Sequence, residues 1–241
     1  MEMNVNKPIL AFALVTLASL CTVSSAAQDS SSQSGKTVRH HRVAQEDRQV
    51  SSQLARAEAA LDRKNYAEAE GLLKKITTSH PDNYRAWFDL GYAYTATKQR
   101  DAAIEAYRRS VDANRQVFES NLNLGILLGE SDSADAEKYL RATTQLEPTA
   151  KADEGHYRAW LSLAKVLQTS KPEEAIKAFR EAARLAPKEA EPHLGAAGLL
   201  EKQSNLSAAE REYQAAAVLA PHSSEPLAGL INIYSHEGKL P

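Results

Sequence analysis

Apolar and polar positions along this chain recur with a period of about 34 residues, from Val50 to the end of the sequence. A small residue marks the same point of each period, with steps of 34, 33, 39 and 34 between Ala69, Ala103, Ala136, Ala175 and Ala209. A second set of positions, four of them proline, gives the same steps: Pro81, Arg115, Pro148, Pro187 and Pro221. A fixed period of this length is typical of stacked units, each too small to bury its own apolar face. The pattern therefore predicts a solenoid.

Within each period, two amphipathic stretches separated by a short polar turn predict a pair of antiparallel helices. Small residues such as Gly91 and Ala103 let the two helices approach, while large ones such as Tyr107 fill the space between them. Each unit is expected to end at its proline, because the residue before a proline disfavours the helical conformation. The predicted fold is an all-α, right-handed superhelical solenoid with five full units and a partial sixth, at 50–83, 84–117, 118–150, 157–189, 190–223 and 224–241.

The second unit carries a recognisable family pattern. Residues 84–117 read YRAWFDLGYAYTATKQRDAAIEAYRRSVDANRQV, and the W-x2-L-G-x2-Y start, Ala103 and Tyr107 resemble the tetratricopeptide repeat. The opening Tyr-Arg-Ala-Trp recurs residue for residue at 157–160. The chain departs from the family pattern at three positions, Gln53, Arg115 and Ile231.

The step of 39 residues contains an insertion of six residues, Lys-Ala-Asp-Glu-Gly-His at 151–156. We expect this polar insertion to lengthen a loop without breaking the stack, because the entropy of loop closure rises slowly with loop length. Alternatively the insertion forms a contact surface, and its removal would then weaken partner binding while leaving the helices intact.

The amino terminus has a different character. Residues 1–27 place Lys7 before an apolar run over 9–20, followed by small residues over 24–27, the order typical of a secretory signal peptide cleaved after Ala26 or Ala27. This order predicts a periplasmic or secreted protein. The alternative is membrane anchoring, by an uncleaved segment or by a lipid on Cys21, the only cysteine. Residues 28–49 are polar and serine-rich and predict a disordered linker before the solenoid at 50–241.

Composition and motifs argue against catalysis and nucleic-acid binding. The formal net charge is -2 and the pI is near 6.4, which gives no electrostatic footprint for nucleic acid. The seven histidines form no His-Glu-x-x-His motif, and the sequence has neither a glycine-rich phosphate loop nor a Gly-x-Ser-x-Gly elbow. We therefore expect no enzyme activity, no catalytic residue, no metal site and no cofactor.

The family resemblance implies that a protein or peptide partner binds in a concave groove lined by the first helix of each unit. Carried over by register, the groove positions are Arg85, Phe88, Tyr92, Leu122, Ile126, Leu161, Lys165 and Leu194. Aromatic and aliphatic side chains beside two bases would suit an apolar segment with an acidic neighbour. The alternative for Phe88 and Leu122 is that they only pack between neighbouring units.

The predicted function is an exported protein–protein interaction scaffold in a bacterial cell-envelope assembly. The alternative is an accessory repeat region of a larger enzyme or secretion complex, with the chain incomplete at its carboxyl end. In the last helix we expect Leu227, Leu230 and Tyr234 to pack on the preceding unit and to leave Ile231 and Ile233 partly bare. Such an edge either continues into further repeats or allows self-association through 224–241.

Overall fold

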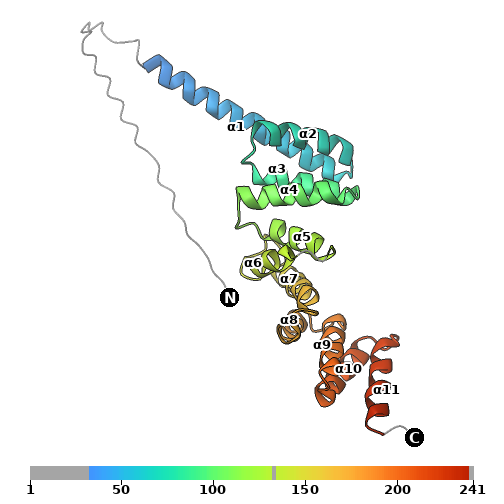
Figure 1. Ribbon diagram of the computed structural model, residues 1–241. Helices are drawn as coiled ribbons and strands as arrows, with labels where there is room; N and C mark the ends of the chain where they lie inside the picture. Colours follow the sequence, from blue (N-terminus) through green and yellow to red (C-terminus); the bar gives the residue numbers. More distant parts are fainter. Residues whose placement is uncertain (1–32, 132–133, 239–241) are drawn as a thin grey trace, which may run out of the picture. The chain divides into compact units, whose positions relative to one another are not determined.

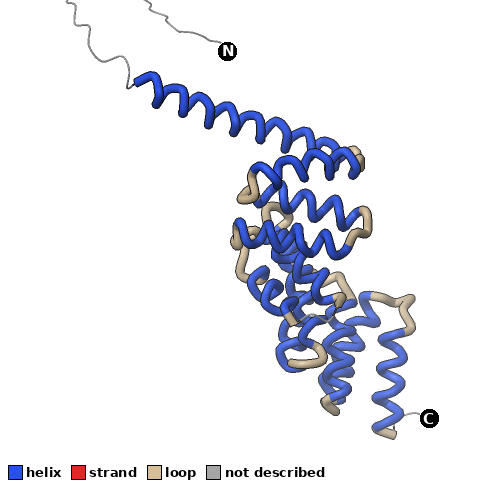
Figure 2. Tube along the Cα trace, turned by 45° about the horizontal axis from the view of Figure 1, so that its top comes forward, coloured by secondary structure: helices blue, strands red, loops and turns tan. Residues whose placement is uncertain are grey.

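A computed structural model describes residues 33–131 and 134–238, with side-chain surroundings from Arg48 onward. In these ranges every regular element is an α-helix, eleven in number, and no strand occurs (Figure 1 and Figure 2). The predicted all-α solenoid is thereby confirmed. The predicted signal peptide, its cleavage site and Cys21 lie outside the described residues. No described helix is both long and apolar enough to cross a membrane.

The chain divides into two compact units, 1–46 and 47–241, and the stacked helix pairs belong to the second. Consecutive helices pack on one another along this unit from α2 to α11, and the end of α1 shares a buried apolar cluster with α2 and α3. Their bounds are α1 Gln33–Asp62, α2 Tyr66–Ser79, α3 Tyr84–Ala96, α4 Arg100–Ala113, α5 Phe118–Gly129, α6 Asp135–Thr143, α7 Ala152–Leu167, α8 Pro172–Leu185, α9 Glu191–Lys202, α10 Leu206–Leu219 and α11 Glu225–His236.

Helix α1 begins inside the segment for which the sequence predicts a disordered linker. Residues 28–32 lie outside the described residues, but residues 33–49 are helical. No glycine or proline interrupts the chain from Lys36 to Asp62, and a helix satisfies its backbone hydrogen bonds internally. The structure therefore differs from the predicted linker over 33–49, and the first helix pair uses only the last part of α1.

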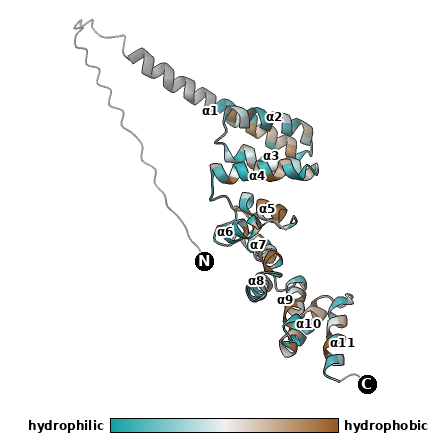
Figure 3. Cartoon of the chain, viewed as in Figure 1, coloured by the Kyte–Doolittle hydropathy of each residue, from teal (hydrophilic) through white to brown (hydrophobic). Residues whose placement is uncertain are grey.

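Local chemistry sets the helix ends and the spacing of the pairs. Asn65 and Asn83 cap α2 and α3, because their side-chain oxygens accept hydrogen bonds from backbone N–H groups in the first turn. Between α3 and α4, a Cβ added at Gly91 would lie 2.7 Å from the ring of Tyr107. This close approach leaves Tyr107 only 1% exposed. Figure 3 shows apolar positions distributed along every helix from α2 to α11, as stacked pairs require.

Five of the six inserted residues are helical. Residues 152–156 form the start of α7, and only Lys151, whose backbone is left-handed (φ 48°), precedes the helix. Two acidic residues in the first turn suit it, because the positive end of the helix dipole attracts carboxylates. His156 packs edge-on against Phe118, with ring centroids 5.6 Å apart. The connection between α6 and α7, residues 144–151, is nevertheless longer than the four or five residues that join the other units, so the expected longer loop is present although the inserted residues lie mainly in the helix. The stack continues, since α7 packs on α5 and α6.

Gly155 makes this packing possible, and we expect Gly155→Leu to lower the melting temperature. A Cβ at position 155 would lie 2.8 Å from Cγ of Pro148 and 3.3 Å from the ring of Phe118. Overpacking of this kind costs about 1–3 kcal/mol. Gly71→Leu is the matched control, because a Cβ there meets nothing within 4 Å and leucine is the better helix former. Thermal unfolding followed by circular dichroism measures both; equal stability of the two variants would contradict the close contact at Gly155.

The last helix, α11, buries a different face from the one expected. Ile233 is fully buried, and Leu230 and Tyr234 are partly buried, whereas Leu227 and Ile231 are 51% and 55% exposed. The prediction was correct for Leu230, Tyr234 and Ile231 and wrong for Leu227 and Ile233. The rotation of the helix about its axis decides which of several neighbouring apolar positions is covered, and the repeat pattern leaves that rotation open.

Candidate functional site

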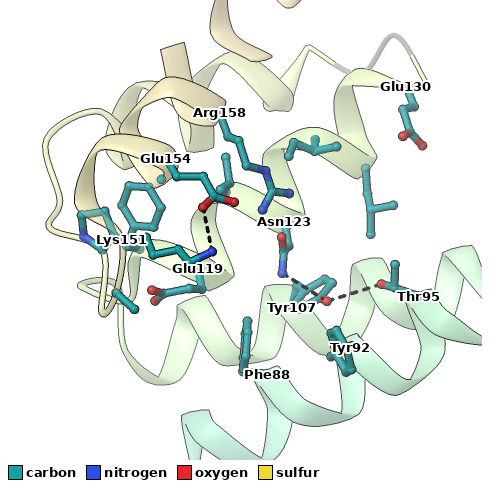
Figure 4. A pocket seen from close by; sticks show the side chains of 17 residues that line it. Phe88, Tyr92, Thr95, Tyr107, Glu119, Asn123, Glu130, Lys151, Glu154 and Arg158 are labelled. Atoms are coloured by element: carbon teal, nitrogen blue, oxygen red, sulfur yellow. Dashed lines mark hydrogen bonds and ion pairs between the residues drawn. The ribbon is translucent and has the colours of Figure 1, made fainter. Parts of the chain in front are cut away.

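A cavity of about 490 Å³ opens between the second, third and fourth helix pairs (Figure 4). Helix α3 contributes Phe88 and Tyr92, and α5 contributes Leu122, Asn123 and Ile126. The remaining wall comes from the loop before α7 and from the first turns of α7, which are built partly from the six inserted residues. A concave, mostly apolar site with a few polar groups is the usual form of a ligand pocket.

Tyr107 anchors the floor of this cavity from α4. Its ring lies 5.8 Å from that of Phe88, at an interplanar angle of 50°. Its hydroxyl accepts hydrogen bonds from Oγ1 of Thr95 at 3.4 Å and from Nδ2 of Asn123 at 3.3 Å. Burial raises the pKa of Tyr107 to about 12, so the phenol stays neutral at physiological pH. The floor is therefore a fixed, uncharged surface rather than a reactive one.

Four of the eight predicted groove residues meet at this cavity: Phe88, Tyr92, Leu122 and Ile126. They differ in exposure, since Tyr92 is 46% exposed, Phe88 and Ile126 are half-buried and Leu122 is buried. Leu122 is thus mainly a packing residue, whereas Tyr92 lies open at the mouth. The remaining aliphatic positions, Leu161 and Leu194, pack in or against the core of the later units and do not line the cavity.

The two predicted bases are engaged elsewhere. Nη2 of Arg85 lies 2.8 Å from Oε1 of Glu58, and Nζ of Lys165 lies 2.6 Å from Oε1 of Glu191. Neither base lines the cavity. The idea that these two cations would attract an acidic partner through this cavity is therefore not supported by their positions.

Other charged side chains line the cavity, and most of them have partners. Glu130 pairs with Arg100 at 2.5 Å, and Glu154 pairs with Lys151 at 3.1 Å. Glu119 accepts hydrogen bonds from the backbone N–H and the hydroxyl of Thr149, at 2.8 and 2.6 Å. The three carboxylates that line the cavity are therefore already satisfied inside the chain.

Arg158 of α7 is the exception among the charged residues that line the cavity. Within the described residues its guanidinium has no ion pair and no hydrogen bond, and the side chain is exposed. Figure 4 shows it reaching from α7 toward Asn123, across the cavity from Phe88 and Tyr92. Arg158 is not among the groove residues predicted from the sequence, although the repeated Tyr-Arg-Ala-Trp places it at the register position of Arg85.

A second unusual group, Asp89, lies on α3 facing α1. One of its carboxylate oxygens, Oδ2, is enclosed and has no hydrogen-bond partner in the described structure. Burial, reinforced by the negative charge of Glu58, raises the pKa of Asp89 to about 7; Arg85 opposes the shift and Asp62 adds to it. Among the described residues, no group of three or more His, Cys, Asp or Glu side chains is arranged to hold a metal ion.

Comparison with known proteins agrees with this architecture. The tetratricopeptide repeat family model matches residues 54–117, 127–190 and 166–224. Superkiller protein 3 of Saccharomyces cerevisiae is 28% identical over 128 residues, a match that covers 50% of this chain and 8% of the yeast protein.

Solved structures share the fold at low sequence identity. PilF of Pseudomonas aeruginosa superposes with a TM-score of 0.61 at 22% identity, covering 80% of this chain and 86% of PilF. YrrB, described as a TPR protein with an unusual peptide-binding site, gives a TM-score of 0.65 at 16% identity, covering 78% and 91%. MamA from Desulfovibrio magneticus RS-1 gives 0.60 at 17% identity, covering 71% and 95%.

The family match and the stacked helix pairs both bear on the general kind of function. Tetratricopeptide repeat proteins are generally scaffolds for protein–protein interaction, and their fold is typically non-catalytic. Because the family model matches more than half of the chain, all of it within the stacked helices, this chain belongs to the tetratricopeptide repeat family.

Proposed function

We propose that this protein is an exported scaffold that binds a linear segment of a partner protein, with the cavity between α3, α5 and α7 as the anchor site. The observation that carries the proposal is the cavity of about 490 Å³ with Tyr92, an aromatic side chain 46% exposed, at its mouth. Large apolar side chains seated in such pockets supply most of the binding energy of many interfaces. The description of YrrB as peptide-binding is consistent with this use of the fold.

Export is the second part of the proposal and rests on residues 1–27. The apolar run over 9–20 and the small residues that follow it have the order of a cleaved signal peptide. A periplasmic or cell-envelope location would place the scaffold among exported partners. Mass spectrometry of the protein recovered from an expressing bacterium tests this: we expect a mature chain beginning at Ala27 or Gln28, and an intact amino terminus would contradict it.

The groove part of the proposal predicts that Phe88→Ala together with Tyr92→Ala weakens partner binding by about 2 kcal/mol or more. Both side chains line the cavity and neither is fully buried, so their loss removes contact surface for a partner and leaves most of the core in place. The measurement is the affinity for end-blocked peptides selected from a random linear library on the wild-type protein.

Val218→Ala is the control for this double variant, because Val218 is 80% exposed on α10 and does not line the cavity. We expect its affinity to equal that of the wild type. Circular dichroism of the double variant confirms that it is folded. A folded double variant with unchanged affinity would show that the partner binds elsewhere, and complete unfolding would show that Phe88 and Tyr92 are packing residues.

A further inference from the structure

At two boundaries between neighbouring units, a pair of facing positions on the first helices carries an ion pair. One of these positions directly follows the small residue in the first helix of a unit. The other lies near the start of the first helix of the next unit. In the first two units this register pairs Glu58 with Arg85 at 2.8 Å. In the fourth and fifth units it pairs Lys165 with Glu191 at 2.6 Å, with the charges exchanged.

The same register places Ile126 opposite Arg158 between the third and fourth units, and both residues line the cavity. Arg158 holds the register position of Arg85, and Ile126 holds that of Glu58. An isoleucine side chain cannot accept a hydrogen bond, so Arg158 has no carboxylate opposite it. The isoleucine instead extends the apolar surface formed with Phe88 and Leu122. An apolar surface and an unpaired cation therefore lie side by side at this boundary.

The other charged side chains that line the cavity add no further unpaired charge. All three carboxylates have partners in the chain, and Lys151 is held by Glu154 at 3.1 Å. A cationic side chain entering the cavity would meet Arg158 and find no free carboxylate. An anionic one would gain a charge-assisted hydrogen bond, which an arginine can make in bidentate form.

Building on the proposed function, we infer that Arg158 selects partner segments in which an aspartate or glutamate side chain adjoins the bulky apolar residue that enters the cavity. The partner carboxylate pairs with Arg158 as Glu58 pairs with Arg85, and the apolar residue packs on Phe88 and Ile126. The segment is an internal one, since the acid that fills the corresponding position elsewhere in the stack is a side chain.

The test selects peptides from a random linear phage library on the purified full-length protein and on three variants. Wild type is expected to enrich an apolar residue beside an acidic one. Arg158→Glu is expected to keep the apolar residue and to lose the acidic one or exchange it for a basic one. Arg211→Glu, an exposed arginine on α10 away from the cavity, is the matched control and should select as the wild type does. The Phe88→Ala, Tyr92→Ala double variant reports whether selection depends on the cavity.

Fluorescence anisotropy with one selected peptide, blocked at both ends, then measures the preference directly. Changing its acidic residue to the corresponding amide should weaken binding to wild type about fivefold and should strengthen binding to Arg158→Glu. The wild-type preference should shrink as salt is raised, because the pair is exposed. A free carboxyl terminus on the amide peptide should not restore the loss, and restoration would assign the site to chain ends instead.

The outcomes separate the two levels of the proposal. Peptides that depend on Phe88 and Tyr92 but show no acidic preference would overturn the role of Arg158 and leave the anchor site standing. Enrichment that survives the double variant, or no enrichment at all, would overturn the anchor site and the role of Arg158 with it.

Discussion

Replacing Tyr107 with alanine is expected to lower the free energy of unfolding by about 3–5 kcal/mol, the range for large aromatic side chains removed from a core. Tyr107 is 1% exposed and fills the space against Gly91 between α3 and α4. Its loss leaves a cavity that the backbone of two packed helices cannot close. Urea unfolding followed by circular dichroism at 222 nm measures the effect.

Two further variants test the assignment of Tyr107 to the core. Tyr107→Phe keeps the ring and loses only the hydroxyl that accepts from Thr95 and Asn123, so it should cost about 1 kcal/mol. Tyr92→Ala removes a tyrosine that borders the same cavity but is 46% exposed, and it should leave the urea midpoint almost unchanged. If Tyr92→Ala were as destabilising as Tyr107→Ala, the mouth and the floor of the cavity would be wrongly assigned.

Asp89→Asn is expected to raise stability most at pH 8 and considerably less at pH 5. The pKa of Asp89 is raised to about 7 in the folded protein by burial and by Glu58, against about 3.9 in an unfolded chain. Between these values the native state binds the proton more tightly, so protonation stabilises the native state as pH falls. Above pH 7 the carboxylate is charged in both states and this stabilisation is absent.

The size of this effect follows from the two pKa values. Between pH 8 and pH 5 the wild type should gain roughly 2–3 kcal/mol relative to Asp89→Asn. Urea unfolding of both proteins at several pH values isolates the contribution of Asp89, because other titrating groups are common to both. Asp112→Asn is the control, since Asp112 is exposed on α4. A constant difference between wild type and Asp89→Asn across this range would contradict the shifted pKa.

The helix pairs and most of their boundaries could be predicted from the sequence alone. The period of about 34 residues, the small–large pairs such as Gly91 with Tyr107, and the prolines that close units are local features. Each acts within one helix pair, so one repeat predicts the next. The same register brought Phe88, Tyr92, Leu122 and Ile126 to a common cavity.

Tertiary structure alone decided which of these positions are available to a partner. Arg85 and Arg158 stand at the same place in the repeat, yet Arg85 is paired with Glu58 and Arg158 faces Ile126. The burial of Asp89 beneath α1 and of Ile233 in α11 likewise depends on how neighbouring helices cross. The insertion at 151–156 became a helix start because Pro148 and Phe118 offered it a surface. The repeat pattern determines the helix pair that each unit forms. Charge pairing and exposure depend on side chains of adjacent units, which the period of a single repeat does not encode.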